Sequence, residues 1–103
     1  MDGLTALADP TRQRIVEMLA SGALASGDIA KRFALTAPAI SQHLKTLREA
    51  KLVRVRPERQ RRIYELDPDG IRELTDWVNN IGKFWSNKLD ALEGALQDTR
   101  KKP

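Results

Sequence analysis

The chain has 103 residues, of which 41% are hydrophobic and 31% charged, and its formal net charge is +4. This length and balance are typical of one soluble domain and exclude a disordered chain. The absence of cysteine excludes disulfides and thiolate metal sites, and a single histidine leaves little for catalysis, so we expect no enzyme. No apolar run approaches membrane-spanning length and the N-terminus is no secretory signal, which predicts a cytoplasmic protein.

The first third of the chain predicts three short helices. Residues 2–8 suggest a short helical arm. Asp9 and Pro10 then mark a helix start, because aspartate caps free amides and proline fits a first turn. Residues 11–20 continue that helix, and Ser21-Gly22 ends it. Ser26 is expected to cap the next helix, which would continue through Phe33.

Thr36 is expected to cap a further helix, with Pro38 in its first turn. Two short helices joined by so tight a turn predict a helix-turn-helix. Ile40, Leu44 and Leu47 fall on one face, which should be buried. The opposite face carries small and polar residues, as a helix that enters a DNA groove requires: Pro38, Gln42, Lys45 and Glu49, flanked by Ala39, Ser41 and Thr46.

Residues 52–56 and 62–66 alternate with period two and predict a β-hairpin whose tip is 57–61. From Thr36 to Arg62 the chain holds eight positive and two negative side chains, a net charge of +6 in a molecule of +4. A patch of one sign needs an anionic partner, and double-stranded DNA is the leading candidate.

The Asp67-Pro68 pair predicts the start of a last helix that runs to about Gln97. Its apolar stripe is longer than a small domain needs, and such a stripe is usually covered by another subunit. Residues 63–98 carry eight acids and three bases. We expect one domain over residues 1–98, followed by a disordered basic tail at 99–103.

Three phrases of the sequence resemble the ArsR family of bacterial repressors. They are Leu7–Arg12 (LADPTR) with Ile15, Ala39–Ala50 (AISQHLKTLREA), and Leu52-Val53. The stretch WVNNIGKFWSNKLDALE is similar to the aromatic-rich final helix of members without metal sites. The resemblance implies a mostly α-helical fold with a small β-hairpin, a winged helix-turn-helix with a long C-terminal dimerisation helix.

The resemblance also implies a homodimer built on the first and last helices, in which DNA release is the response to signals. The residues expected at the dimer interface are Leu4, Leu7, Trp77, Val78, Ile81, Phe84, Trp85, Leu89 and Leu92. Metal-sensing members carry a cysteine pair near the helix-turn-helix or Asp, His and Glu ligands on the last helix. Residues 24–28 have no thiol and the last helix has no histidine, so no metal or other cofactor is predicted. The tip also lacks the glycine common in this family.

In each subunit the helix that begins after Thr36, the recognition helix, would enter a major groove. The hairpin, or wing, would contact the flanking DNA backbone. Gln42 can pair bidentately with adenine, Ser41 and Thr36 can meet a phosphate or base edge, and the cations can contact phosphates. The predicted DNA-binding residues are Thr36, Pro38, Ala39, Ser41, Gln42, His43, Lys45, Arg48, Arg59, Gln60 and Arg61. Thr36 could equally be only a helix cap. Asp67 and Asp69 are expected to cap the last helix rather than to form a site of paired carboxylates.

Other interpretations stay open. We expect His43 to be a packing or phosphate-contacting residue rather than a metal ligand or a pH switch. Trp77, Phe84 and Trp85 form the dimer core, an apolar effector pocket between subunits, or both. The leading function is a metal-independent homodimeric repressor that binds an inverted-repeat operator on the bacterial nucleoid. The alternative is a winged-helix interaction module whose basic face docks an acidic protein.

Overall fold

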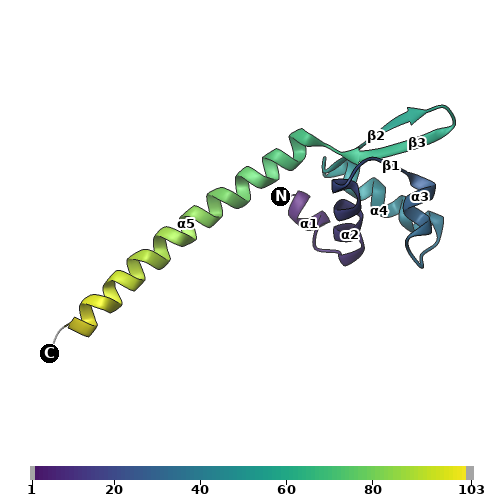
Figure 1. Cartoon of the computed structure of the whole chain (residues 1–103). Coiled ribbons are helices and arrows are strands. Elements are labelled where there is room, and N and C mark those ends of the chain that lie inside the picture. Colours follow the sequence, from purple (N-terminus) through teal and green to yellow (C-terminus); the bar gives the residue numbers. More distant parts are fainter. Residues whose placement is uncertain (1, 102–103) are drawn as a thin grey trace.

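A small helical head carries one long projecting helix (Figure 1). The computed structural model describes residues 2–101, and the side chains of residues 2–97. The elements, in chain order, are α1 (Asp2–Ala6), α2 (Pro10–Ala20), β1 (Leu24–Ala25), α3 (Ser26–Lys31), α4 (Ala37–Glu49), β2 (Val53–Glu58), β3 (Arg61–Leu66) and α5 (Pro68–Lys101). We call residues 2–66 the head. The molecule measures 74 × 28 × 22 Å because α5 extends away from the head.

Helix starts follow the predicted caps at three positions. The Asp9 carboxylate accepts from the amides of Thr11 (2.8 Å) and Arg12 (3.1 Å), with Pro10 in the first turn of α2. The Thr36 hydroxyl accepts from the Ala39 amide at 3.3 Å. Each cap satisfies amides that have no partner within the helix. The Asp67 carboxylate caps α5 by accepting from the amides of Asp69 and Gly70.

The cap predicted at Ser26 was wrong. Ala25 precedes α3 and Ser26 is its first residue, with no side-chain cap. This helix also ends at Lys31, short of Phe33. The reason is that Leu24 and Ala25 are held in a strand, which fixes where the chain can turn into the helix.

The sheet has three antiparallel strands in the order β1-β3-β2, one more than the predicted hairpin. Leu24 pairs with Tyr64 and Ala25 with Ile63, while β2 and β3 pair from Val53↔Leu66 to Glu58↔Arg61. The wing tip is therefore the two residues Arg59 and Gln60, not the five predicted. Arg59 takes the glycine's place with a φ of 59°.

The core lies between the helices and the sheet. Ile40, Leu44 and Leu47 of α4 are buried as predicted. They pack with buried residues from α1, α2, α3, the loop after α4, β2 and β3: Ala6, Ile15, Leu19, Ile29, Leu52, Val53 and Tyr64. Burial of one complete face fixes how α4 is rotated, and so which side chains it presents to solvent.

Helix α5 leaves the head after its first two turns. Ile71 and Leu74 pack against the core, and the helix then continues to Lys101, past the predicted end near Gln97 and through residues 99–101 of the predicted tail. Lys102 and Pro103 lie outside the described residues. Among the helices described, none is long and apolar enough to cross a membrane.

Candidate nucleic-acid interface

The solvent face of α4 is the centre of the site. Pro38, Ser41, Gln42, Lys45 and Arg48 are exposed there, opposite the buried face. Ala39 and His43 are half-buried at its margins, and Thr36 is exposed at the start of the helix. In the part of the chain that the structure describes, the Gln42 side chain makes no hydrogen bond, so its amide keeps both its donor and its acceptor for a base edge.

A hollow of about 360 Å³ separates α4 from the wing. It is lined by Pro38, Ser41, Gln42, Lys45, Arg48, Arg62 and Tyr64. Three of these seven side chains are cations and none is an acid, which suits the hollow to a phosphate backbone. Lys45 also faces Glu49 at 4.0 Å, an exposed pair that contributes little.

Arg62 was counted in the basic stretch but left out of the predicted DNA-binding residues. It lines the hollow beside α4, whereas the predicted Arg59, Gln60 and Arg61 lie at or next to the exposed tip. The signal was present, because alternation along β3 places Arg62 on the same side as Tyr64, a core residue beside α4.

The wing arginines have carboxylate neighbours that the sequence did not indicate. Arg61 lies 2.8 Å from Asp28 of α3. Arg54 and Arg56 lie 3.1 Å and 3.7 Å from Glu65. The arginines of these pairs are 51–61% exposed, so each pair is worth only about 0–1 kcal/mol and can be exchanged for a phosphate.

His43 is tied to α2. Its Nδ1 lies 3.3 Å from Arg12 Nη1, and Arg12 Nε donates to the Ala6 carbonyl at 2.6 Å. Because a guanidinium only donates, Nδ1 accepts, and the ring proton is on Nε2. Nearby Asp9 has its pKa lowered, first by the hydrogen bond from the Arg12 backbone amide, against a smaller desolvation effect, and then by the Thr11 amide and the charge of Arg12. The predicted DNA contact of His43 stays a prediction.

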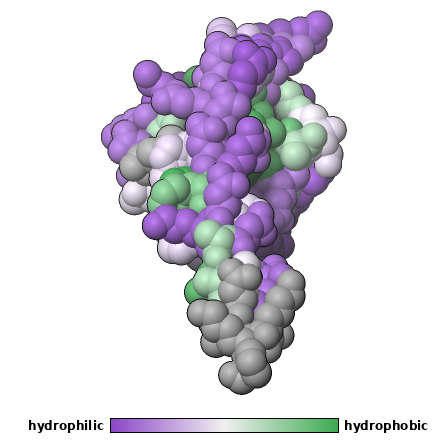
Figure 2. All heavy atoms as spheres, turned by 90° about the vertical axis from the view of Figure 1, so that its left-hand side faces the viewer, coloured by the Kyte–Doolittle hydropathy of each residue, from purple (hydrophilic) through white to green (hydrophobic). Residues whose placement is uncertain are grey.

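The predicted dimer residues separate into two groups. Leu7 is half-buried against the core, and Leu4 is 38% exposed. On α5 every predicted residue is exposed, from Ile81 at 37% to Leu89 at 61%, and Leu96 extends the stripe. Viewed from the α5 side, hydrophobic surface flanks a hydrophilic ridge (Figure 2).

The α5 stripe repeats every seven residues. Ile71, Val78, Trp85 and Leu92 form one series with this spacing, and the further pairs are Leu74 and Ile81, Trp77 and Phe84, and Leu89 and Leu96. Phe84 and Trp85 stack edge to face with ring centroids 5.9 Å apart. A continuous exposed apolar stripe of this length indicates an interface with another chain.

Metal ligands are not gathered anywhere in residues 2–97. No three side chains of His, Cys, Asp or Glu come together there as a ligand group. Asp67 serves as a cap, accepting from the amides of Asp69 (3.1 Å) and Gly70 (3.4 Å), as predicted.

Comparison with known proteins agrees with this geometry. Residues 7–56 match the helix-turn-helix domain family. The HTH-type transcriptional regulator Rv2034 of Mycobacterium tuberculosis is 48% identical over 82% of this chain and 76% of its own. The transcriptional repressor SdpR of Bacillus subtilis is 33% identical over 82% and 93%.

A solved structure extends the likeness to the fold. The homodimeric winged helix-turn-helix DNA-binding domain of Mb0332 from Mycobacterium bovis is 27% identical, with a TM-score of 0.66 over 80% of this chain and 76% of that one. The resemblance drawn from the three sequence phrases is therefore confirmed. The arsenical resistance operon repressor of Staphylococcus xylosus is 32% identical over 74% of this chain and 69% of its own. The chain belongs to the ArsR family of winged helix-turn-helix transcriptional regulators.

Proposed function

We propose that this protein is a homodimeric repressor that binds an inverted-repeat operator in double-stranded DNA without a metal cofactor. The observation that carries the proposal is the hollow between α4 and the wing, where Gln42 lies among Lys45, Arg48 and Arg62. An uncharged amide among cations suits base recognition beside phosphate neutralisation. The proposed DNA-binding residues are those predicted from the sequence, with Arg62 added.

The dimer is proposed from the α5 stripe. Its exposed side chains include both tryptophans, which carry large apolar areas that isolated subunits would leave in water. A two-fold dimer would present its two α4 helices about 34 Å apart, in successive major grooves. The homodimeric state of Mb0332 supports this arrangement.

Metal independence is proposed from the donor set. The one histidine is engaged by Arg12, the chain has no cysteine, and the described acids are not clustered. A signal would then act through protein abundance, or through an apolar effector bound between subunits near Trp77, Phe84 and Trp85. We place the protein on the bacterial nucleoid, in the cytoplasm.

The test is a titration of labelled duplexes with the purified protein over a range of salt concentrations. Duplexes selected from a random library should be palindromic and bind roughly a thousandfold more tightly than random sequence. Random-sequence binding should fall steeply with salt. Weak, salt-insensitive binding to every duplex would favour the interaction module with an acidic protein partner. A reporter gene placed behind the selected site should be repressed, and activation would refute the repressor assignment.

A further inference from the structure

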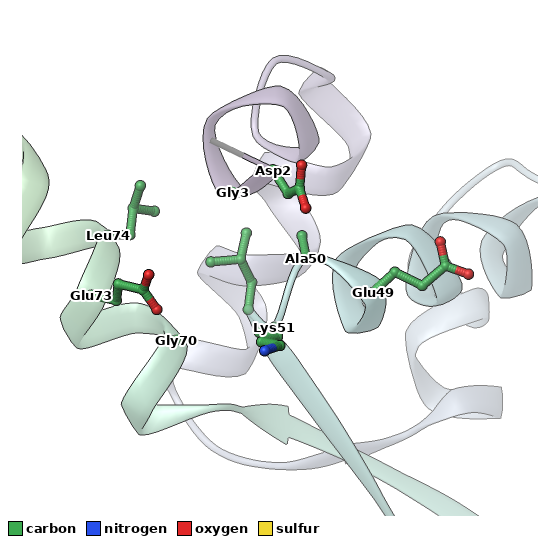
Figure 3. A pocket seen from close by; sticks show the side chains of 9 residues that line it. Asp2, Gly3, Glu49, Ala50, Lys51, Gly70, Glu73 and Leu74 are labelled. Atoms are coloured by element: carbon green, nitrogen blue, oxygen red, sulfur yellow. The ribbon is translucent and has the colours of Figure 1, made fainter.

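The start of α5 lies directly on the loop that ends α4 (Figure 3). A Cβ atom added to Gly70 would lie 1.6 Å from the carbonyl oxygen of Lys51 and 2.7 Å from its carbon. The obstacle is backbone, which cannot rotate aside as a flexible side chain can. Glycine is therefore required here by close approach.

The loop that Gly70 meets is itself fixed. Lys51 has a φ of 63°, its amide donates to Arg48 O, and the Leu52 amide donates to Leu47 O, both at 3.0 Å. This is a helix end closed by a residue in the left-handed region. The loop therefore moves with α4.

Helix α5 is bonded to the same loop. The Asp67 amide donates to Leu52 O at 2.9 Å, and the Asp67 carboxylate accepts from the Gly70 amide. On the other side, a Cβ on Gly3 of α1 would lie 3.6 Å from both Leu52 and Leu74. The three segments line a hollow of about 220 Å³, so the start of α5 lies between the loop on one side and α1 on the other.

We propose that Gly70 is a positioning residue that sets the angle between α5 and α4, and thereby the spacing at which a dimer reads two half-sites. This inference rests on the proposed homodimer and its inverted-repeat operator. The residue touches no DNA. It acts by letting the backbone of α5 contact the loop that ends α4.

The expected tilt follows from the geometry. To reach ordinary contact at 3.4 Å from 1.6 Å, a Cβ at Gly70 must move by about 2 Å. Asp67 holds the helix end roughly 5 Å away along the axis, so the tilt is about 20°. At Asn80, about 20 Å from Asp67, this displaces the helix by about 7 Å.

The first experiment measures that angle within one chain and needs no DNA. Because the chain has no cysteine, Glu17→Cys on α2 and Asn80→Cys on α5 give two unique spin-label sites, both exposed. Labelled protein is diluted with unlabelled protein so that pulsed dipolar spectroscopy reports the intrachain distance. Gly70→Ala should shift that distance by roughly 5 Å or more.

Gly94→Ala is the matched control, because a Cβ there meets nothing within 4 Å. It should leave the distance unchanged. Circular dichroism checks that each variant keeps the wild-type helix content. Asp67→Ala adds no atom and removes the acceptor of the Gly70 amide, so it should broaden the distance distribution even if Gly70→Ala does not fold. A wild-type distance in folded Gly70→Ala, or in Asp67→Ala where Gly70→Ala is unfolded, would overturn the inference.

The second experiment measures spacing. Duplexes selected by the wild-type protein are remade with one or two base pairs inserted or removed at the centre. Gly70→Ala should lose about tenfold in affinity at the original spacing, keep its random-sequence affinity and shift its preferred spacing. An unchanged preference would contradict the inference. A wild-type protein without any spacing preference would refute the proposed operator, while the label distance still decides the role of Gly70.

Discussion

Trp85 offers a direct test of the α5 interface. The residue is 57% exposed and, within the described part of the chain, its ring stacks only on Phe84, so its loss should not disturb the core. A tryptophan presents roughly 250 Å², so covering the exposed part buries about 140 Å² per subunit. At ~25 cal/mol per Å² this is about 3.5 kcal/mol for each of two copies. The alanine side chain would still bury some apolar area, and neither tryptophan would be covered completely. We therefore expect the dimer to lose about 3 kcal/mol of association free energy rather than the sum of both contributions.

Trp85→Ala should therefore raise the dimer dissociation constant about a hundredfold. Sedimentation velocity over a dilution series measures this constant directly. Asn87→Ala is the control, since Asn87 lies on the far side of the same helix from the stripe, and it should dimerise as the wild type does. Equal dissociation constants for Trp85→Ala and the wild type would remove this face of α5 from the interface.

Gln42→Ala should weaken binding to the selected duplex by about 1–3 kcal/mol for each of the two half-sites and leave random-sequence binding nearly unchanged; an equal loss on both, in a fluorescence titration, would argue against base recognition. Arg61→Ala should reduce the slope of log affinity against log salt by roughly 0.9 for each subunit, about 1.8 for the dimer, despite its pair with Asp28, whereas Arg72→Ala on α5 should not; identical slopes would exclude a phosphate contact. Asp9→Ala should lower the melting temperature most near neutral pH. The folded-state pKa of Asp9 is lowered, so its contribution is present above the unfolded pKa and disappears as pH falls through the folded value; a difference that stays constant down to about pH 2 would contradict the cap.

The parts of this fold that the sequence predicted depend on neighbours within one turn. The caps Asp9, Thr36 and Asp67 act on amides two or three residues ahead, and the buried face of α4 follows from helical spacing. The site on α4 was predictable for the same reason. Once Ile40, Leu44 and Leu47 are assigned to the core, Gln42 and Lys45 must face solvent.

The parts that were missed join segments far apart in the chain. Strand β1 has two residues, too few to show alternation, and it exists because Leu24 and Ala25 meet Tyr64 and Ile63. The Arg61–Asp28 pair and the Gly70–Lys51 approach are equally non-local. Local patterns carry no information on such contacts, since the same residues would look the same in a different topology.

The seven-residue repeat along α5 determines how two such helices can run together. Seven residues in two turns is about 3.5 per turn, slightly less than the 3.6 of an undistorted helix, so a pair that keeps this stripe in contact winds into a left-handed supercoil. The helix has 34 residues, about 51 Å, and a supercoil turns once in about 150 Å, so the pair would complete only about a third of a turn. Little coiling is then available to absorb a wrong angle at the start of the helix, and an error there would be carried almost undiminished to its far end.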